Sequence, residues 1–156
     1  MASISHHNLT KILDKIVKNN SCFKTIKKIK IIDDDTNRII DYDPDYAIKR
    51  VISNHTYYIL VFEVIEGQSD TKTMADIARI IAKQEIKKAV FICSNQKKLE
   101  ETKRIASALL GSYKDRFEKK NKNEIIDISI RELLPTDTEV ELEKIVLEEL
   151  KPFLPK

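Results

Sequence analysis

The chain has only two glycines and two cysteines among its 156 residues, and it has no long hydrophobic run. A phosphate-binding glycine loop needs several glycines at fixed spacing, and neither GxGxxG nor GxxxxGK[ST] occurs. Cys22 and Cys93 lie outside any CxxC pair or Cys/His cluster, which argues against a zinc site. No stretch approaches the roughly 20 apolar residues that cross a bilayer. We therefore expect no glycine-loop nucleotide site, no zinc site and no membrane span.

The composition is typical of a folded protein, with 42% hydrophobic and 34% charged residues. This length fits one domain with one sizeable core, which we place over residues 1–156. The first residues lack the basic and apolar regions of a signal peptide, so we expect a cytoplasmic protein. His6 and His7 are expected in a loose N-terminus.

The distribution of charge says more than the net charge of +3, which by itself does not indicate nucleic acid. Six lysines and no acid fall between Lys15 and Lys30. Such a basic stretch can contact phosphates. The alternative, to which we give equal weight, is a well-solvated surface rich in lysine.

Hydrophobic spacing predicts nine elements. The first two strands are expected to form an antiparallel hairpin around a turn at residues 33–37, with an interruption near Pro44. Gly111 is expected to stop the third helix, and Thr138 to cap the fourth, which ends before Pro152. Helices are predicted at 8–19, 71–84, 97–110 and from Thr138 onward, and strands at 23–32, 38–49, 57–65, 89–93 and 125–130.

The predicted order of elements is α-β-β-β-α-β-α-β-α, without an internal repeat. This mixed alternation predicts an α/β protein, a three-layer α/β/α sandwich with a central mixed sheet of about four to five strands. The segment 57–65 is almost entirely β-branched or aromatic, which indicates a central strand buried on both faces.

Glu63 is the one charged residue in that strand. A carboxylate among apolar neighbours is costly to bury unless it is protonated, paired or bound to a metal. The alternative is an edge position at which Glu63 faces water.

Asp45 follows Pro44 in the preceding strand. Asp-Pro-Asp is ordinary turn chemistry, and alone it favours a turn. Together, however, Asp45 and Glu63 lie on consecutive strands that are expected to be neighbours. Two carboxylates there would suit Mg²⁺ or Mn²⁺, because Mg²⁺ prefers a few carboxylates together with water and phosphate oxygens.

Pro44-Asp45, then Phe62-Glu63-Val64, then the helix from Thr71 resemble the core of the PD-(D/E)XK nuclease superfamily. The resemblance covers roughly residues 8–130. It implies a restriction-endonuclease-like core, as in restriction enzymes, junction resolvases and archaeal or viral nucleases. The motif is short and degenerate, so the order of elements carries much of the inference.

The sequence departs from this pattern at Ile65, where the family usually has a lysine two residues after the glutamate. Some members supply the lysine from the following helix, and Lys72 is the natural candidate here. Lys72 falls opposite the predicted apolar stripe from Met74 to Ile81, so the alternative is a solvated surface lysine. Gln68, Glu66 and Lys49 are weaker substitutes.

The resemblance implies a metal-dependent DNA endonuclease that hydrolyses phosphodiester bonds. Asp45 and Glu63 would hold Mg²⁺ or Mn²⁺, Lys72 would act on the attacking water, and DNA would be the partner, with a homodimer as a possible assembly. The alternative is a catalytically inactive nuclease-like fold that binds nucleic acid or protein. A third hypothesis is an unrelated α/β domain in which Asp-Pro-Asp is only a turn.

Overall fold

The computed structural model describes residues 4–32, 36–83, 85–121, 126–134 and 136–155, with side chains described outside 4–5 and 112–121. The helices are α1 (Ile4–Asn19), α2 (Asp70–Ala82), α3 (Gln96–Asn121), α4 (Glu139–Leu150) and the short 3₁₀ helix η1 (Lys151–Phe153). The strands are β1 (Phe23–Ile26), β2 (Ile29–Ile32), β3 (Ile39–Tyr42), β4 (Tyr46–Val51), β5 (Tyr57–Ile65), β6 (Ile86–Cys93) and β7 (Asp127–Glu132).

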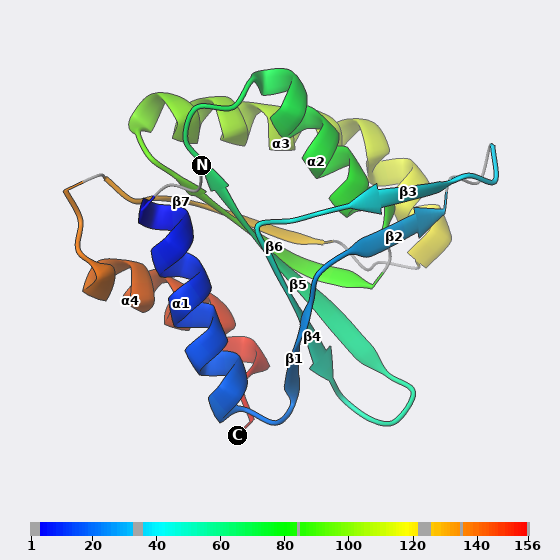
Figure 1. Cartoon of the computed structure of the whole chain (residues 1–156). Coiled ribbons are helices and arrows are strands. Elements are labelled where there is room, and N and C mark those ends of the chain that lie inside the picture. Colours follow the sequence, from blue (N-terminus) through cyan, green and yellow to red (C-terminus); the bar gives the residue numbers. More distant parts are fainter. Residues whose placement is uncertain (1–3, 33–35, 84, 122–125, 135, 156) are drawn as a thin grey trace.

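Five of these strands form one mixed sheet in the order β1-β4-β5-β6-β7. β1, β4 and β5 are antiparallel, whereas β5, β6 and β7 are parallel. Helices α2 and α3 cover one face of the sheet, and α1 and α4 cover the other (Figure 1). The predicted three-layer α/β/α sandwich with a mixed sheet is therefore confirmed.

The predicted N-terminal hairpin is present but divided between two sheets. The open end of the hairpin is β1 paired with β4 in the main sheet. The end that carries the turn is β2 paired with β3 in a separate two-stranded sheet, which extends beyond the main body (Figure 1). Pro44 lies at the break, where its missing N–H cannot join a ladder. Asn37, at the turn, has a φ of 57°, a left-handed conformation that Asn tolerates. Asp33, Asp34 and Asp35 lie outside the described residues.

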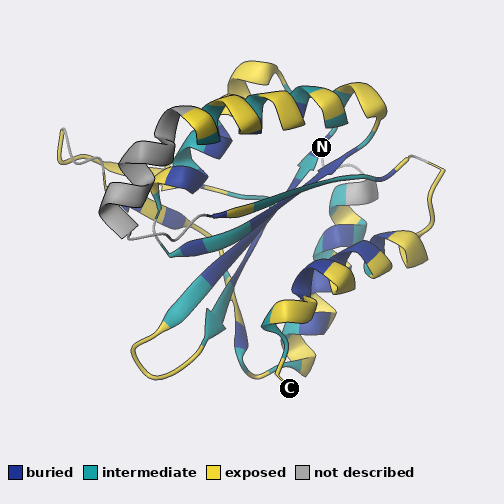
Figure 2. Ribbon diagram, turned by 180° about the vertical axis from the view of Figure 1, so that it is seen from behind, coloured by how far each residue is buried: buried dark blue, intermediate teal, exposed yellow. Residues whose placement is uncertain are grey.

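β5 lies at the centre of the sheet and is buried along most of its length (Figure 2). Its side chains alternate between the faces: Leu60 and Phe62 pack towards α1 and α4, and Val61 and Ile65 pack towards α2. Glu63 has the same parity as Val61 and Ile65. Its side chain therefore belongs to the α2 face.

Three sequence expectations were wrong in detail. α3 continues through Gly111, which has a negative φ instead of the positive φ of a glycine that ends a helix. β6 begins at Ile86 rather than 89, and α1 begins at Ile4 and includes His6 and His7. The expected cap of α4 is confirmed, since the Thr138 side chain accepts a hydrogen bond from the Glu141 N–H.

Within the described ranges, every helix is too short or too polar to span a membrane.

A buried carboxylate, Glu149, holds α4 to the sheet. The Glu149 carboxylate lies 2.8 Å from Lys88 Nζ and 3.0 Å from Arg131 Nη1, and it accepts a hydrogen bond of 2.6 Å from Ser129 Oγ. Burial alone would raise the pKa of Glu149, but hydrogen bonds from Lys88, Ser129 and Arg131 lower it below its ordinary value. The ionised form is therefore the one that this network stabilises.

We expect Glu149→Gln to lower the free energy of unfolding by about 3 kcal/mol at neutral pH, because it removes the charge of a buried carboxylate that pairs with both Lys88 and Arg131. A carboxyl pKa lowered by folding stabilises the fold above the unfolded pKa, and this contribution disappears as the pH falls through the folded value. The difference between variant and wild type should therefore vanish in acid. Urea unfolding across pH measures it.

Glu148→Gln is the matched control. Glu148 also contacts Arg131, at 2.8 Å, but its side chain is 46% exposed. A surface pair of this kind contributes less than about 1 kcal/mol. The structural role of Glu149 would be contradicted if both substitutions lowered the free energy of unfolding equally. It would also be contradicted if the loss caused by Glu149→Gln persisted in acid.

Candidate metal centre

Asp45 and Glu63 lie side by side on the α2 face of the sheet. The β4–β5 ladder ends with Tyr46 opposite Phe62, and one further step brings Asp45 opposite Glu63. Residues directly opposite each other in an antiparallel pair have their side chains on the same face. The structure therefore brings the two predicted carboxylates together.

Two short hydrogen bonds fix these carboxylates. The Asp45 backbone N–H donates to Glu63 Oε1 at 2.6 Å, and the Val64 N–H donates to Asp45 Oδ2 at 2.7 Å. Each acid is thus held by the backbone of the strand that carries the other. This reciprocal arrangement orients the two carboxyl groups before any ligand binds.

The two acids differ in their exposure. Glu63 is only 3% exposed, whereas the side chain of Asp45 is partly open to solvent. Burial, followed by the negative charge of Asp45, raises the pKa of Glu63 well above its ordinary value, although the Asp45 N–H acts in the opposite direction. A carboxyl group in this environment is either protonated or neutralised by a cation.

Lys72 lies in the first turn of α2, which begins just after β5. The Ser69 side chain caps this helix by accepting from the Lys72 N–H. Partial burial lowers the pKa of Lys72, but the hydrogen bond with Asp76 and the charges of Asp76, Glu63 and Asp45 raise it above its ordinary value. Lys72 therefore stays protonated within the electrostatic reach of both predicted metal ligands.

The predicted position of Lys72, opposite the apolar stripe of α2, was wrong. The stripe is rotated: Thr73, Ile77 and Ile80 are buried, whereas Met74 is exposed. Lys72 lies at the margin of this stripe, with its side chain 60% exposed and its Nζ 3.1 Å from Asp76 Oδ2. It is neither buried in the site nor free in solvent.

The other candidates for the missing lysine have different environments. Ile65 is buried in the apolar cluster beneath α2. Gln68 donates to Thr73 Oγ1, and Glu66 is half-buried just after β5. Lys49 lies over the Tyr57 ring, further along β4 from Asp45. Lys72 is the cation among these that interacts with the two carboxylates.

Three residues near the site were missed as functional candidates. Asp76 is buried on α2, and Tyr42 is buried at the end of β3. His6 was expected in a loose N-terminus, but it lies in α1 with Nε2 3.4 Å from Asp45 Oδ1. For Asp76, a signal existed in its spacing of four from Lys72. For Tyr42 and His6 the sequence holds none, because their positions depend on long-range packing.

The carboxylate oxygens of Asp45 and Glu63 suit a small hard cation for which the protein supplies only some of the ligands. In the described part of the chain, no three or more His, Cys, Asp or Glu side chains are arranged so that they could hold a metal ion together. Mg²⁺ does not require this, because it is often bound by one or two carboxylates and completes its shell with water and phosphate oxygens. Asp45 and Glu63 meet that requirement, with Asp45 on the open side.

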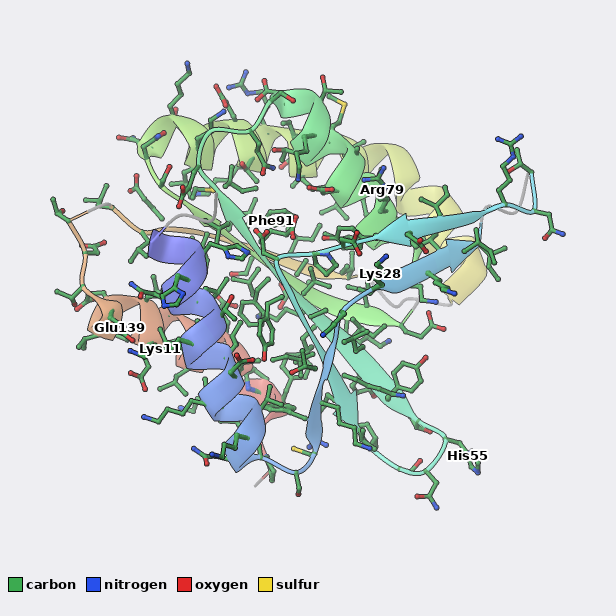
Figure 3. The ribbon with its side chains drawn as sticks, in the orientation of Figure 1. Lys11, Lys28, His55, Arg79, Phe91 and Glu139 are labelled. Atoms are coloured by element: carbon green, nitrogen blue, oxygen red, sulfur yellow. The ribbon has the colours of Figure 1, made fainter. Side chains whose placement is uncertain are left out.

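The six lysines between Lys15 and Lys30 are all exposed. They lie on α1, β1 and β2 and in the connection between these two strands, where Lys28 is labelled in Figure 3. Their ammonium groups are therefore available to a phosphate backbone.

Comparison with protein-family models, with curated proteins and with solved structures found no significant match for this chain.

Proposed function

We propose that the protein is a metal-dependent DNA endonuclease of the PD-(D/E)XK type, which hydrolyses phosphodiester bonds. The observation that carries this proposal is the Asp45–Glu63 pair. The two acids stand opposite each other on neighbouring strands, and each accepts a hydrogen bond from the strand of its partner. The burial of Glu63 beside a second acid disfavours a purely structural explanation.

In this proposal Asp45 and Glu63 hold Mg²⁺ or Mn²⁺. The bound ion would supply an activated water and neutralise charge that develops on the phosphate. Lys72, protonated and at the N-terminal end of α2, would orient the attacking water and attract the scissile phosphate. The exposed lysines of α1, β1 and β2 would hold the flanking phosphates.

The test is cleavage of a supercoiled plasmid by the purified protein. We expect nicked and linear DNA in the presence of Mg²⁺ or Mn²⁺ and none in EDTA, because the phosphate charge is then no longer neutralised. Activity should return when Mg²⁺ is added in excess of EDTA. Unchanged cleavage in EDTA, or none with either ion, would contradict the proposal.

A second candidate function is a nucleic-acid-binding module without catalysis. Ile65 in place of the usual lysine favours it. This alternative expects DNA to bind with strong salt dependence and to remain intact. A gel-shift series run beside the cleavage assay distinguishes the two.

A further inference from the structure

Asp76 is the charged residue on the buried face of α2. It is 4% exposed and lies between the buried residues Thr73 and Ile77, so its carboxylate is removed from water. A buried carboxylate requires partners of opposite charge or hydrogen-bond donors. The identity of these partners shows what Asp76 can do.

Its two oxygens contact two cations of the same helix. Oδ2 lies 3.1 Å from Lys72 Nζ, and Oδ1 lies 3.4 Å from Arg79 Nη1, the residue labelled on α2 in Figure 3. The Asp76 carboxyl also interacts with the Glu63 carboxyl on β5 and helps to raise the pKa of Glu63. One carboxyl group therefore links the Lys72 ammonium to the predicted metal ligand.

A second feature indicates that this place receives a polar ligand. Tyr42 is 1% exposed, and among the described residues its hydroxyl has no hydrogen-bond partner. Burial raises the pKa of Tyr42, and the charges of Glu63, Asp76 and Asp45 raise it further. An unpaired buried hydroxyl beside three acids is rare in a purely structural network.

We propose that Asp76 is a positioning residue that holds the Lys72 ammonium beside Glu63, where a phosphodiester and its attacking water would lie. Without this contact, Lys72 would be a long, largely exposed side chain with many accessible rotamers. The contact therefore supplies from α2 what a lysine at position 65 would supply directly from β5. This inference rests on the proposed nuclease function.

The first test is a double-mutant cycle in the plasmid assay. Asp76→Asn should lower kcat about 10-fold and leave KM nearly unchanged, as expected for a group that orients another. In a Lys72→Met background, Asp76→Asn should not lower kcat any further, because its effect on kcat depends on Lys72. If the losses in kcat of the two single variants add in the double variant, the proposal is overturned. It is also overturned if Asp76→Asn loses as much Mn²⁺ affinity as a Glu63 variant.

The second test follows acetylation of lysines by mass spectrometry and does not depend on DNA cleavage. Lys72 in the wild type should react more slowly than Lys144, an exposed lysine on α4, because pairing with Asp76 keeps it protonated. Asp76→Asn should speed the reaction of Lys72 several-fold. Arg79→Gln, which removes the other cationic partner of Asp76, should leave the rate at Lys72 unchanged. Equal rates for Lys72 and Lys144 would overturn the proposal even if Asp76→Asn did not fold.

The two tests separate the possible failures. If the wild type does not cleave DNA, the nuclease function is overturned, and the positioning role falls with it. If the wild type cleaves normally and Asp76→Asn keeps its kcat, only the positioning role is overturned.

Discussion

Glu63→Gln is expected to reduce DNA cleavage by about 1,000-fold, equivalent to about 4 kcal/mol of transition-state stabilisation. Glutamine keeps the size of the side chain and can still accept the hydrogen bond from the Asp45 N–H. It removes the negative charge that would hold the cation. The measurement is the initial rate of plasmid nicking with Mg²⁺, after confirming the fold by circular dichroism.

The same substitution is expected to stabilise the protein in EDTA by about 1 kcal/mol, a typical gain when a functional group under strain is replaced. In the wild type, Glu63 is buried against Asp45 and Asp76, and their charges oppose its ionisation. A glutamine amide can instead donate to Asp76. Glu148→Gln, on the other face of the sheet, should change neither activity nor stability appreciably. A Glu63→Gln variant that is less stable in EDTA would indicate a structural role.

Lys72→Met is expected to lower kcat about 100-fold, within the range that a positioned proton donor or acceptor contributes. Methionine preserves much of the aliphatic stem and removes the ammonium. Since the Lys72 side chain is largely exposed, the free energy of unfolding should change by less than about 1 kcal/mol. Single-turnover cleavage with enzyme in excess measures the effect on the chemical step.

Lys144→Gln is the control for lysine removal, because Lys144 is exposed on α4, on the far side of the sheet. It should cleave at the wild-type rate. If Lys72→Met also cleaves at that rate, another group must orient the water, and the proposal that Lys72 replaces the missing lysine at position 65 is wrong. Binding of a short DNA duplex should weaken only slightly in Lys72→Met, since one phosphate contact is lost.

The central pair was predictable because its signals are local. The run of apolar residues in β5 fixed the bounds 57–65 correctly, and Glu63 stood out as the one charge in it. Consecutive strands usually pair, so Asp45 was expected nearby. The register that sets the two acids opposite each other depends on the whole β4–β5 ladder, which no short motif encodes.

The parts that were missed depend on tertiary packing. The rotation of the α2 stripe is set by how Ile77 and Ile80 meet the sheet, and it decides that Asp76 points inward and Lys72 lies at the margin. A buried aspartate breaks the rule that apolar residues mark the inner face. Exceptions of this kind are expected at functional sites, where local preference yields to chemistry.

The most direct measurement of the central claim is a crystal structure of the wild-type protein soaked in Mn²⁺, with an anomalous difference map. The account predicts an anomalous peak bound by one oxygen of Asp45 and one of Glu63, at metal–oxygen distances of roughly 2.0–2.2 Å. The same map from Glu63→Gln crystals should lose the peak. A wild-type map without a peak at these residues, or with Mn²⁺ only elsewhere, would contradict the assignment of Asp45 and Glu63 as a metal centre.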